Sequence, residues 1–154
     1  MSKLSRPRQQ VVNKKARFEY EIIEELEAGL VLLGPEVKSL RLGRGNLTDS
    51  FVHISEGEAY LVNADIIGYS FADLTDYDPR RRRKLLLSKK EISSLEQKVK
   101  TGRYSLIPLK IYPKGNVFKV AVAVARGKKQ FEKREAIKRR DLEREARTEI
   151  KLRV

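Results

Sequence analysis

The 154-residue chain contains no cysteine, no tryptophan and a single histidine, His53. The lack of cysteine excludes disulfides, thiolate metal sites and cysteine nucleophiles within this sequence. His53 lies in an expected strand, Phe51–Ser55, without an evident nucleophile or carboxylate partner, so a structural or surface role is favoured over a catalytic one. The composition gives no positive case for an enzyme, and we expect none.

Motifs for metals and nucleotides are also missing. Asp73, Asp76 and Asp78 could in principle ligate a hard cation, but the spacing lacks the bidentate glutamate that ends a calcium loop. We interpret these aspartates as part of a polar, turn-rich loop. Gly43-Arg44-Gly45 and Gly127-Lys128-Lys129 lack the glycine spacing and the Ser/Thr of a phosphate-binding loop. We therefore expect no metal and no cofactor.

Long hydrophobic runs are absent from the sequence. The longest, such as Val120–Ala125, are far shorter than the roughly 18 apolar residues of a membrane span. Met1–Val12 has no apolar signal core, and it is too short and too little amphipathic for an organelle transit peptide. We expect a cytoplasmic protein that binds neither a membrane nor a small-molecule substrate.

Positive charge is abundant and concentrated at the two ends of the chain. The net charge is +13. Residues 1–17 hold six basic and no acidic groups, and residues 126–154 hold twelve basic and six acidic groups. The body between them is nearly balanced, with sixteen basic and fifteen acidic groups. A balanced body with basic ends is typical of a folded platform that grips a polyanion. Nucleic acid is the first candidate, because many separate Lys/Arg contacts release counterions from a phosphate chain. Basic ends that only confer solubility are the alternative.

Hydrophobic patterns predict one mainly β domain with helices. We expect strands at 18–22, 30–33 and 66–69 and hairpins at 51–55/59–62 and 105–112/117–125. Helices are expected from Pro35 to Gly43 or Gly45, and from the Ser88 capping box to about Lys100. These elements fit a small antiparallel barrel of the oligonucleotide-binding type with about three helices. In the last strand valines alternate with alanines, and the alanine face would let another element pack closely.

We divide the chain into a basic arm at 1–12, a nucleic-acid-binding domain at 13–125 and a basic tail at 126–154. The apolar stripe of the tail is too thin to drive docking on the body. Glu135 with Arg139, and Glu143 with Arg147, are spaced for helical ion pairs. We expect the tail to be a nascent helix or disordered when free, and a helix when bound to a polyanion.

Two short clusters of cations are candidate contacts to phosphate. Asn13–Arg17 has three cations in five residues just before an expected strand, and an ordinary basic arm is the alternative interpretation. Arg80–Lys84 is a run of five cations before Leu85-Leu86-Leu87. Five adjacent like charges repel one another, so a polyanionic partner would relieve this cost, and a solvated flexible loop is the alternative.

Six blocks of the sequence together resemble the signature blocks of the small protein B family. They occur in the family's order and at its spacing, over about residues 13–140. The blocks are Asn13–Arg17, Glu27–Gly29, Glu36–Arg41, Asp78-Pro79 with Arg83–Leu87, Ile107–Lys110, and Gly127–Lys129 with Glu132–Arg134. The sequence departs from the family at Phe18, where His is common, and at Glu132, where Asp is common.

The resemblance implies a barrel of the oligonucleotide-binding type that performs no chemistry. It implies binding to the tRNA-like domain of transfer-messenger RNA and delivery of that RNA to stalled ribosomes for trans-translation, the ribosome-rescue pathway. The implied RNA contacts are Asn13, Lys14, Lys15, Arg17, Glu27, Glu36, Lys38, Arg41, Leu86 and Lys119. The implied tail contacts, in the empty decoding centre and mRNA channel with their ribosomal RNA, are Arg126, Gly127, Lys128, Lys129, Glu132, Lys133 and Arg134.

Glu27 stands out among these contacts because a carboxylate does not bind phosphate favourably. It can accept hydrogen bonds from base amino groups or 2′-hydroxyls, or it can orient a neighbouring Lys or Arg. For the whole protein, the runner-up is a basic ribosomal protein or assembly factor whose tail is buried in ribosomal RNA. An RNA-processing nuclease is disfavoured because the sequence offers no catalytic site.

Overall fold

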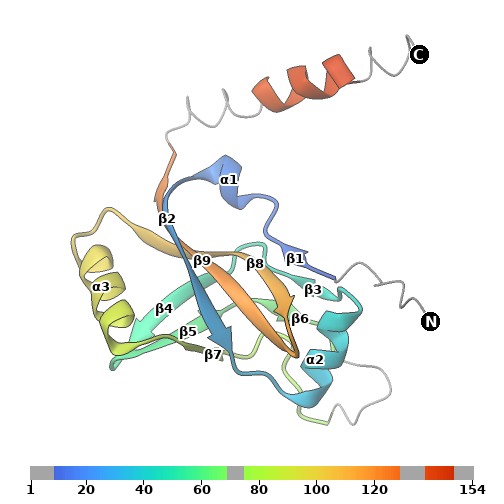
Figure 1. Cartoon of the computed structure of the whole chain (residues 1–154), viewed down its shortest axis with the longest axis vertical. Coiled ribbons are helices and arrows are strands. Elements are labelled where there is room, and N and C mark those ends of the chain that lie inside the picture. Colours follow the sequence, from blue (N-terminus) through green and yellow to red (C-terminus); the bar gives the residue numbers. More distant parts are fainter. Residues whose placement is uncertain (1–8, 69–74, 129–137, 148–154) are drawn as a thin grey trace.

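A seven-stranded antiparallel sheet dominates the computed structural model, which describes residues 9–68, 75–128 and 138–147 (Figure 1). The hydrogen-bonded order is β1-β8-β9-β2-β7-β5-β4, and β3 pairs with β6 in a separate two-stranded sheet. The strands are β1 Val11–Val12, β2 Tyr20–Leu30, β3 Gly45–Asn46, β4 Phe51–Ser55, β5 Glu58–Val62, β6 Asp65–Ile66, β7 Arg83–Leu86, β8 Ser105–Lys114 and β9 Val117–Gly127. The helices are α1 Ala16–Glu19, α2 Gly34–Arg41, α3 Lys89–Lys100 and a helix at 138–147.

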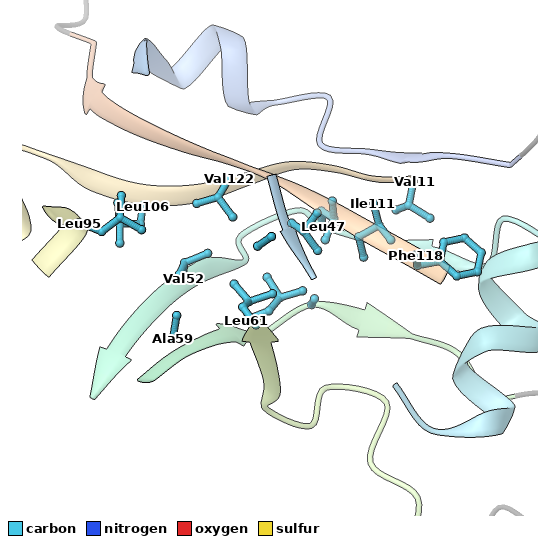
Figure 2. Packing of buried hydrophobic residues seen from close by; sticks show 14 of the residues in the cluster. Val11, Leu47, Val52, Ala59, Leu61, Leu95, Leu106, Ile111, Phe118 and Val122 are labelled. Carbon is cyan, nitrogen blue, oxygen red and sulfur yellow. The ribbon is translucent and has the colours of Figure 1, made fainter. Parts of the chain in front are cut away.

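The main core lies between the β8–β9 hairpin and the β4–β5 hairpin, because the sheet folds over on itself. Figure 2 shows Val122 and Ile111 on one side of this core and Val52 and Leu61 on the other. At one end α3 closes the core with Leu95, which is 2% exposed. The predicted capping box of α3 is confirmed: the Glu91 amide donates to Ser88 Oγ at 3.2 Å, and the Ser88 amide donates to Glu91 Oε1 at 3.0 Å.

Strand β9 is buried on both faces. Val120, Val122 and Val124 enter the main core, and the alanines form a second cluster with Ile107 and Leu109 of β8. Ala16 of α1 packs on this alanine face and is only 2% exposed. The expectation that the alanines would let another element pack closely is therefore confirmed, and the element is α1.

The first strand differs from the sequence-based prediction. Ala16–Glu19 form the short helix α1, and one long strand, β2, covers most of the region where two strands were expected. The strand pairs along β9 from Tyr20 to Gly29, with an irregularity between Ile22 and Glu24. The alternation holds for Tyr20 and Ile22, which lie in β2 and pack on the same cluster, whereas Phe18 and Glu19 belong to α1.

The mainly β, antiparallel prediction is confirmed, but the sheet is not closed into a barrel. Strand β4 packs against β8, yet within the described residues β4 forms backbone pairs only with β5. The edge of β8 is already occupied, because the Asn13 amide donates to the Leu109 carbonyl at 2.8 Å and the Asn13 side chain to the Pro108 carbonyl at 2.9 Å. Pro108 itself has no N–H to offer β4.

The sheet extends beyond the expected 13–125 domain at both of its ends. Val11–Val12 of the predicted arm form β1 and pair with Ile111 and Lys110 of β8. At the other end β9 runs to Gly127, two residues beyond the expected end at Ala125. The described tail segment, 138–147, is helical.

Candidate nucleic-acid interface

The side of the sheet that carries α1 brings residues from four neighbouring strands together, among them the candidates Lys119 and Leu86. Across β8, β9, β2 and β7, the pairing places Tyr112, Lys119, Gly29 and Leu86 in one row. The neighbours of this row along each strand, such as Ile111, Val120, Ala28 and Leu85, point into the main core. We call this outer side of β8–β9–β2–β7 the four-strand face.

Gly29 gives Leu86 its position on the four-strand face. A Cβ atom at Gly29 would lie only 3.0 Å from Leu86 Cβ, so the missing side chain leaves room for the leucine. Leu86 is 56% exposed, which is unusual for a leucine in a central part of a sheet. The result is an apolar contact surface beside the ammonium-bearing Lys119.

Glu27 lies on the same face and is held by two donors from β8. The Tyr112 hydroxyl donates to Glu27 Oε2, and Lys114 Nζ lies 3.0 Å from Oε1 and 3.3 Å from Oε2. The hydrogen bonds from Tyr112 and Lys114 lower the pKa of the Glu27 carboxyl below its usual value. Burial and the bond to Glu27 raise the pKa of Tyr112 to about 12. The site thus pairs an ionised carboxylate with a neutral phenol.

The Asn13–Arg17 segment lies at the α1 end of the four-strand face. Asn13 is half-buried and committed to β8, as described above, so it acts mainly as an anchor. Lys14 and Lys15 are exposed. Arg17 is also exposed, and its guanidinium donates to Glu25 Oε1 at 3.2 Å.

Glu36 is fully buried and so does not reach the protein surface. Its carboxylate accepts from Arg83 Nε at 2.7 Å, from Arg81 Nε at 3.0 Å, from the Tyr77 hydroxyl at 3.2 Å and from the Leu33 amide at 2.8 Å. Burial alone would raise the pKa of Glu36, but the hydrogen bonds from Arg81 and Leu33 and the charge of Arg83 outweigh it and lower the pKa. The carboxylate joins α2 to the segment that leads into β7.

The two exposed cations of α2 depend on this buried anchor. Lys38 and Arg41 follow Glu36 by two and five residues and point away from the core. Both views place α2 beside the end of β9 that carries Phe118 (Figures 1 and 2). Glu36 therefore positions the helix that carries these cations.

The cationic run Arg80–Lys84 uses most of its charge within the protein, which neither interpretation of the sequence anticipated. Arg81 and Arg83 pair with Glu36. The guanidinium of Arg82 lies 3.8 Å from the centre of the Tyr60 ring, and Lys84 Nζ lies 3.1 Å from Glu58 Oε1. Arg83 is fully buried, so its pairing relieves the expected repulsion inside the fold.

The tail begins as a continuation of β9 that is tied to α1. Arg126 pairs with Glu21, and Gly127 lies opposite Tyr20. The Lys128 amide donates to the Glu19 carbonyl at 2.9 Å, and Lys128 Nζ donates to the Arg17 carbonyl at 2.8 Å. The remaining tail candidates lie outside the described residues: Lys129, Glu132, Lys133 and Arg134.

The helix at 138–147 also meets α1. The guanidinium of Arg140 lies 4.6 Å from the centre of the Phe18 ring, a cation–π contact. Phe18 is one of the two positions where the sequence departs from the small protein B pattern. The two contacts made by Lys128 and Arg140 thus bring the described parts of the tail to the helix that carries Arg17.

Sequence reasoning missed Tyr112, Lys114 and Lys110, the ammonium of which lies 5.1 Å from the centre of the Tyr112 ring. Only the pairing of β8 through β9 to β2 brings them to Glu27, and a sequence does not display that register. Over the described ranges, no group of three or more His, Cys, Asp or Glu residues could hold a metal ion. Over the same ranges, no helix is long and apolar enough to cross a membrane.

Known proteins are similar to this chain in both sequence and fold. The family described as SmpB protein matches residues 10–152. The SsrA-binding protein of Malacoplasma penetrans is 47% identical over 142 residues, which cover 92% of this chain and 97% of that protein. The SsrA-binding protein of Streptococcus suis is 48% identical over 139 residues, which cover 90% of each.

A solved chain from work described as "tmRNA-SmpB: a journey to the center of the bacterial ribosome" has the same fold. It superposes with a TM-score of 0.67 at 43% identity, over 83% of this chain and 94% of that one. Sequence and structure agree over most of the length, and this chain belongs to the SmpB family.

Proposed function

We propose that this chain binds the tRNA-like domain of transfer-messenger RNA, also called SsrA RNA, and delivers it to stalled ribosomes for trans-translation. Its relatives are named SsrA-binding proteins, and the solved relative is described with tmRNA and the bacterial ribosome. The observation that carries the proposal is the four-strand face. It aligns Lys119, the exposed Leu86 and the carboxylate of Glu27 on neighbouring strands.

Each candidate residue has a role that follows from its position. Lys14, Lys15, Arg17 and Lys119 supply charge for the phosphate backbone, and Lys38 and Arg41 extend this charge onto α2. Glu27 accepts a hydrogen bond from a sugar or a base, and Leu86 packs on an apolar surface of the RNA. The other two implied contacts, Asn13 and Glu36, act through the residues that they position.

The tail reaches the ribosome in this proposal. The tail, 126–154, enters the empty decoding centre and the mRNA channel as a helix beyond the end of β9, with contacts from Arg126, Gly127, Lys128, Lys129, Glu132, Lys133 and Arg134. Support comes from the helix at 138–147, which lies beyond α1 and away from the strands of the sheet (Figure 1). The bond from Lys128 to the Arg17 carbonyl ties the start of the tail to α1.

Three further statements belong to the same proposal. The protein acts by binding and performs no chemistry, in keeping with the RNA-binding names of its relatives. It works in the cytoplasm, where stalled ribosomes are found. Its sheet is an open relative of the oligonucleotide-binding barrel, in which Asn13 and β1 cover the edge of β8 that would otherwise close on β4.

Competition binding tests the proposal. Equilibrium binding to the isolated tRNA-like domain is measured at about 150 mM salt, with ordinary tRNA as competitor. We expect tight binding that excess tRNA does not displace. Equal and steeply salt-dependent binding to both RNAs would show only general attraction to phosphate. That outcome would overturn the proposal in favour of a ribosomal protein or assembly factor, which would be present stoichiometrically in all ribosomes.

A further inference from the structure

Three side chains from β2 and β8 form one hydrogen-bonded unit on the four-strand face. Glu27 is the acceptor, and Tyr112 and Lys114 are the donors. The Glu27 side chain remains 38% exposed, so a ligand can reach it. Lys119 lies on β9 directly between the two strands, and Lys110 lies over the Tyr112 ring.

The hydrogen bonds leave one acceptor position open on the carboxylate. An ionised carboxylate has about four lone-pair positions. On Oε2 the Tyr112 hydroxyl and Lys114 occupy both, and on Oε1 Lys114 occupies one. The remaining position on Oε1 suits a single hydrogen-bond donor from outside the protein.

The surrounding charges decide which part of an RNA meets this position. Lys110, Lys114 and Lys119 attract the phosphate groups, and the Glu27 carboxylate repels them. The partner for Oε1 is therefore a hydrogen-bond donor on a sugar or a base, not a phosphate group. RNA carries two such donors, the 2′-hydroxyl and the exocyclic amino group of a base.

We propose that Tyr112 is a specificity-determining positioning residue: its hydroxyl holds Glu27 so that Oε1 accepts one donor, a 2′-hydroxyl or a base amino group, from the bound RNA. The inference rests on the proposed function and deepens it. A glutamate that is oriented before binding loses less conformational freedom when the RNA arrives. It also offers its acceptor in one direction, so an RNA without a donor at that point leaves the acceptor unsatisfied.

The chain contains a matched control for this unit. On β5 and β7, the Tyr60 hydroxyl donates to Glu58 Oε2 at 2.6 Å, and Lys84 Nζ lies 3.1 Å from Glu58 Oε1. The same three residue types thus form a similar unit, in which the lysine contacts one carboxylate oxygen, outside the row formed by Tyr112, Lys119, Gly29 and Leu86. Tyr60→Phe and Tyr112→Phe each remove one hydroxyl and keep the ring.

The test compares the Kd for the tRNA-like domain with the Kd for ordinary tRNA in full-length protein. For Tyr112→Phe we expect the preference for the tRNA-like domain to fall about tenfold, the usual scale of a hydrogen bond to a charged group. The salt slope should stay unchanged because no cation is removed. Tyr60→Phe should keep the preference, and Tyr112→Phe should have no further effect once Glu27→Gln is present.

Two RNA series identify the donor. Single 2′-deoxy substitutions in the tRNA-like domain test the 2′-hydroxyl, and inosine for guanosine or purine riboside for adenosine tests the amino group. One substitution should weaken the wild-type complex and leave the Tyr112→Phe complex unaffected. The inference is overturned if wild type and Tyr112→Phe prefer the tRNA-like domain over ordinary tRNA to the same extent. It is also overturned if no RNA substitution affects the two proteins differently. If wild type itself shows no preference for the tRNA-like domain, the proposed function is overturned instead.

Discussion

Arg83 Nε donates to Glu36 Oε2 across 2.7 Å, and neither side chain is exposed to solvent. The pair joins α2 to β7, and the two residues are forty-seven positions apart in the chain. Arg83 uses its other donors on the carbonyls of Ala64 at 2.8 Å and Pro79 at 2.9 Å. A buried guanidinium whose donors are satisfied in this way fixes the loop before β7 against the body.

Glu36→Ala should strongly destabilise the fold. The substitution leaves Arg83 buried without its carboxylate, which typically costs about 3–5 kcal/mol of unfolding free energy. Urea unfolding of the full chain measures the loss. The matched control is Glu25→Ala, which removes the exposed partner of Arg17 and should cost no more than about 1 kcal/mol. Equal losses in the two variants would show that the buried cluster contributes no more than a surface pair.

The same carboxylate predicts how stability depends on pH. The pKa of Glu36 in the folded protein is lowered from an ordinary value of 4.5, despite its burial, by Arg81, Leu33 and Arg83. A carboxylate whose pKa is lower in the folded protein than in the unfolded chain stabilises the fold. This stabilisation is fully present above pH 4.5 and is lost as the pH falls through the pKa of the folded protein.

Thermal unfolding of wild type and Glu36→Gln between pH 7 and pH 3 tests this dependence. The gap in Tm between them should be constant above about pH 5 and narrow as the pH falls further. The contributions of other carboxylates with lowered pKa values, Glu27 and Glu58, cancel in the difference. A gap that stays constant down to pH 3 would contradict the ionised, paired state of Glu36.

Much of the fold could be predicted because its signals are local. The capping box at Ser88, the turn at Glu56-Gly57 and the alternation of valine and alanine in β9 each depend on neighbouring residues. The fate of Arg80–Lys84 could not be predicted in this way. Its partners Glu36, Glu58 and Tyr60 come from distant segments, and a run of charge does not reveal whether it will be buried.

In the candidate site, too, single residues could be predicted from the sequence, but their arrangement in space could not. Resemblance to a family pointed to single residues such as Glu27, Leu86 and Lys119, which lie far apart in the sequence. Only the strand pairing shows that they share one face, and that Tyr112 adjoins them. Glu36 illustrates the converse, since its position in a signature block does not distinguish an RNA contact from a buried anchor.

Gly29→Ala should disturb the four-strand face without changing its charge. The added methyl group would lie 3.0 Å from Leu86 Cβ, so the leucine must move, at a cost of about 1–3 kcal/mol in stability. We expect weaker binding to the tRNA-like domain with an unchanged salt slope, measured by salt titration.

Gly34→Ala is the control for this variant, because nothing lies within 4 Å of an added methyl group there. The double variant Gly29→Ala/Leu86→Ala removes the close contacts with Leu86 Cδ1 and Cγ but keeps the one with Cβ, so it should recover part of the lost stability and none of the RNA affinity. If both Gly29 variants bind the tRNA-like domain with full affinity, Leu86 is not part of the RNA interface.

Truncation separates the two proposed activities, and the structure decides where the chain should be cut. A stop after Ala125 removes Arg126, which pairs with Glu21, and Lys128, which bonds to the carbonyls of Arg17 and Glu19. It would therefore loosen α1, which lies on the four-strand face, as well as remove the tail. A stop after Lys128 keeps these contacts and removes only the residues beyond them.

The two truncated proteins should differ in RNA binding and agree in ribosome rescue. The form that ends at Lys128 should bind the tRNA-like domain as wild type does, and the form that ends at Ala125 should bind it more weakly. Neither should support trans-translation on stalled ribosomes, because both lack the part of the tail beyond Lys128 that enters the decoding centre in our proposal. Rescue by the longer form would place ribosome engagement in the body of the protein. Strong loss of RNA binding in the longer form would instead place part of the RNA interface in the tail.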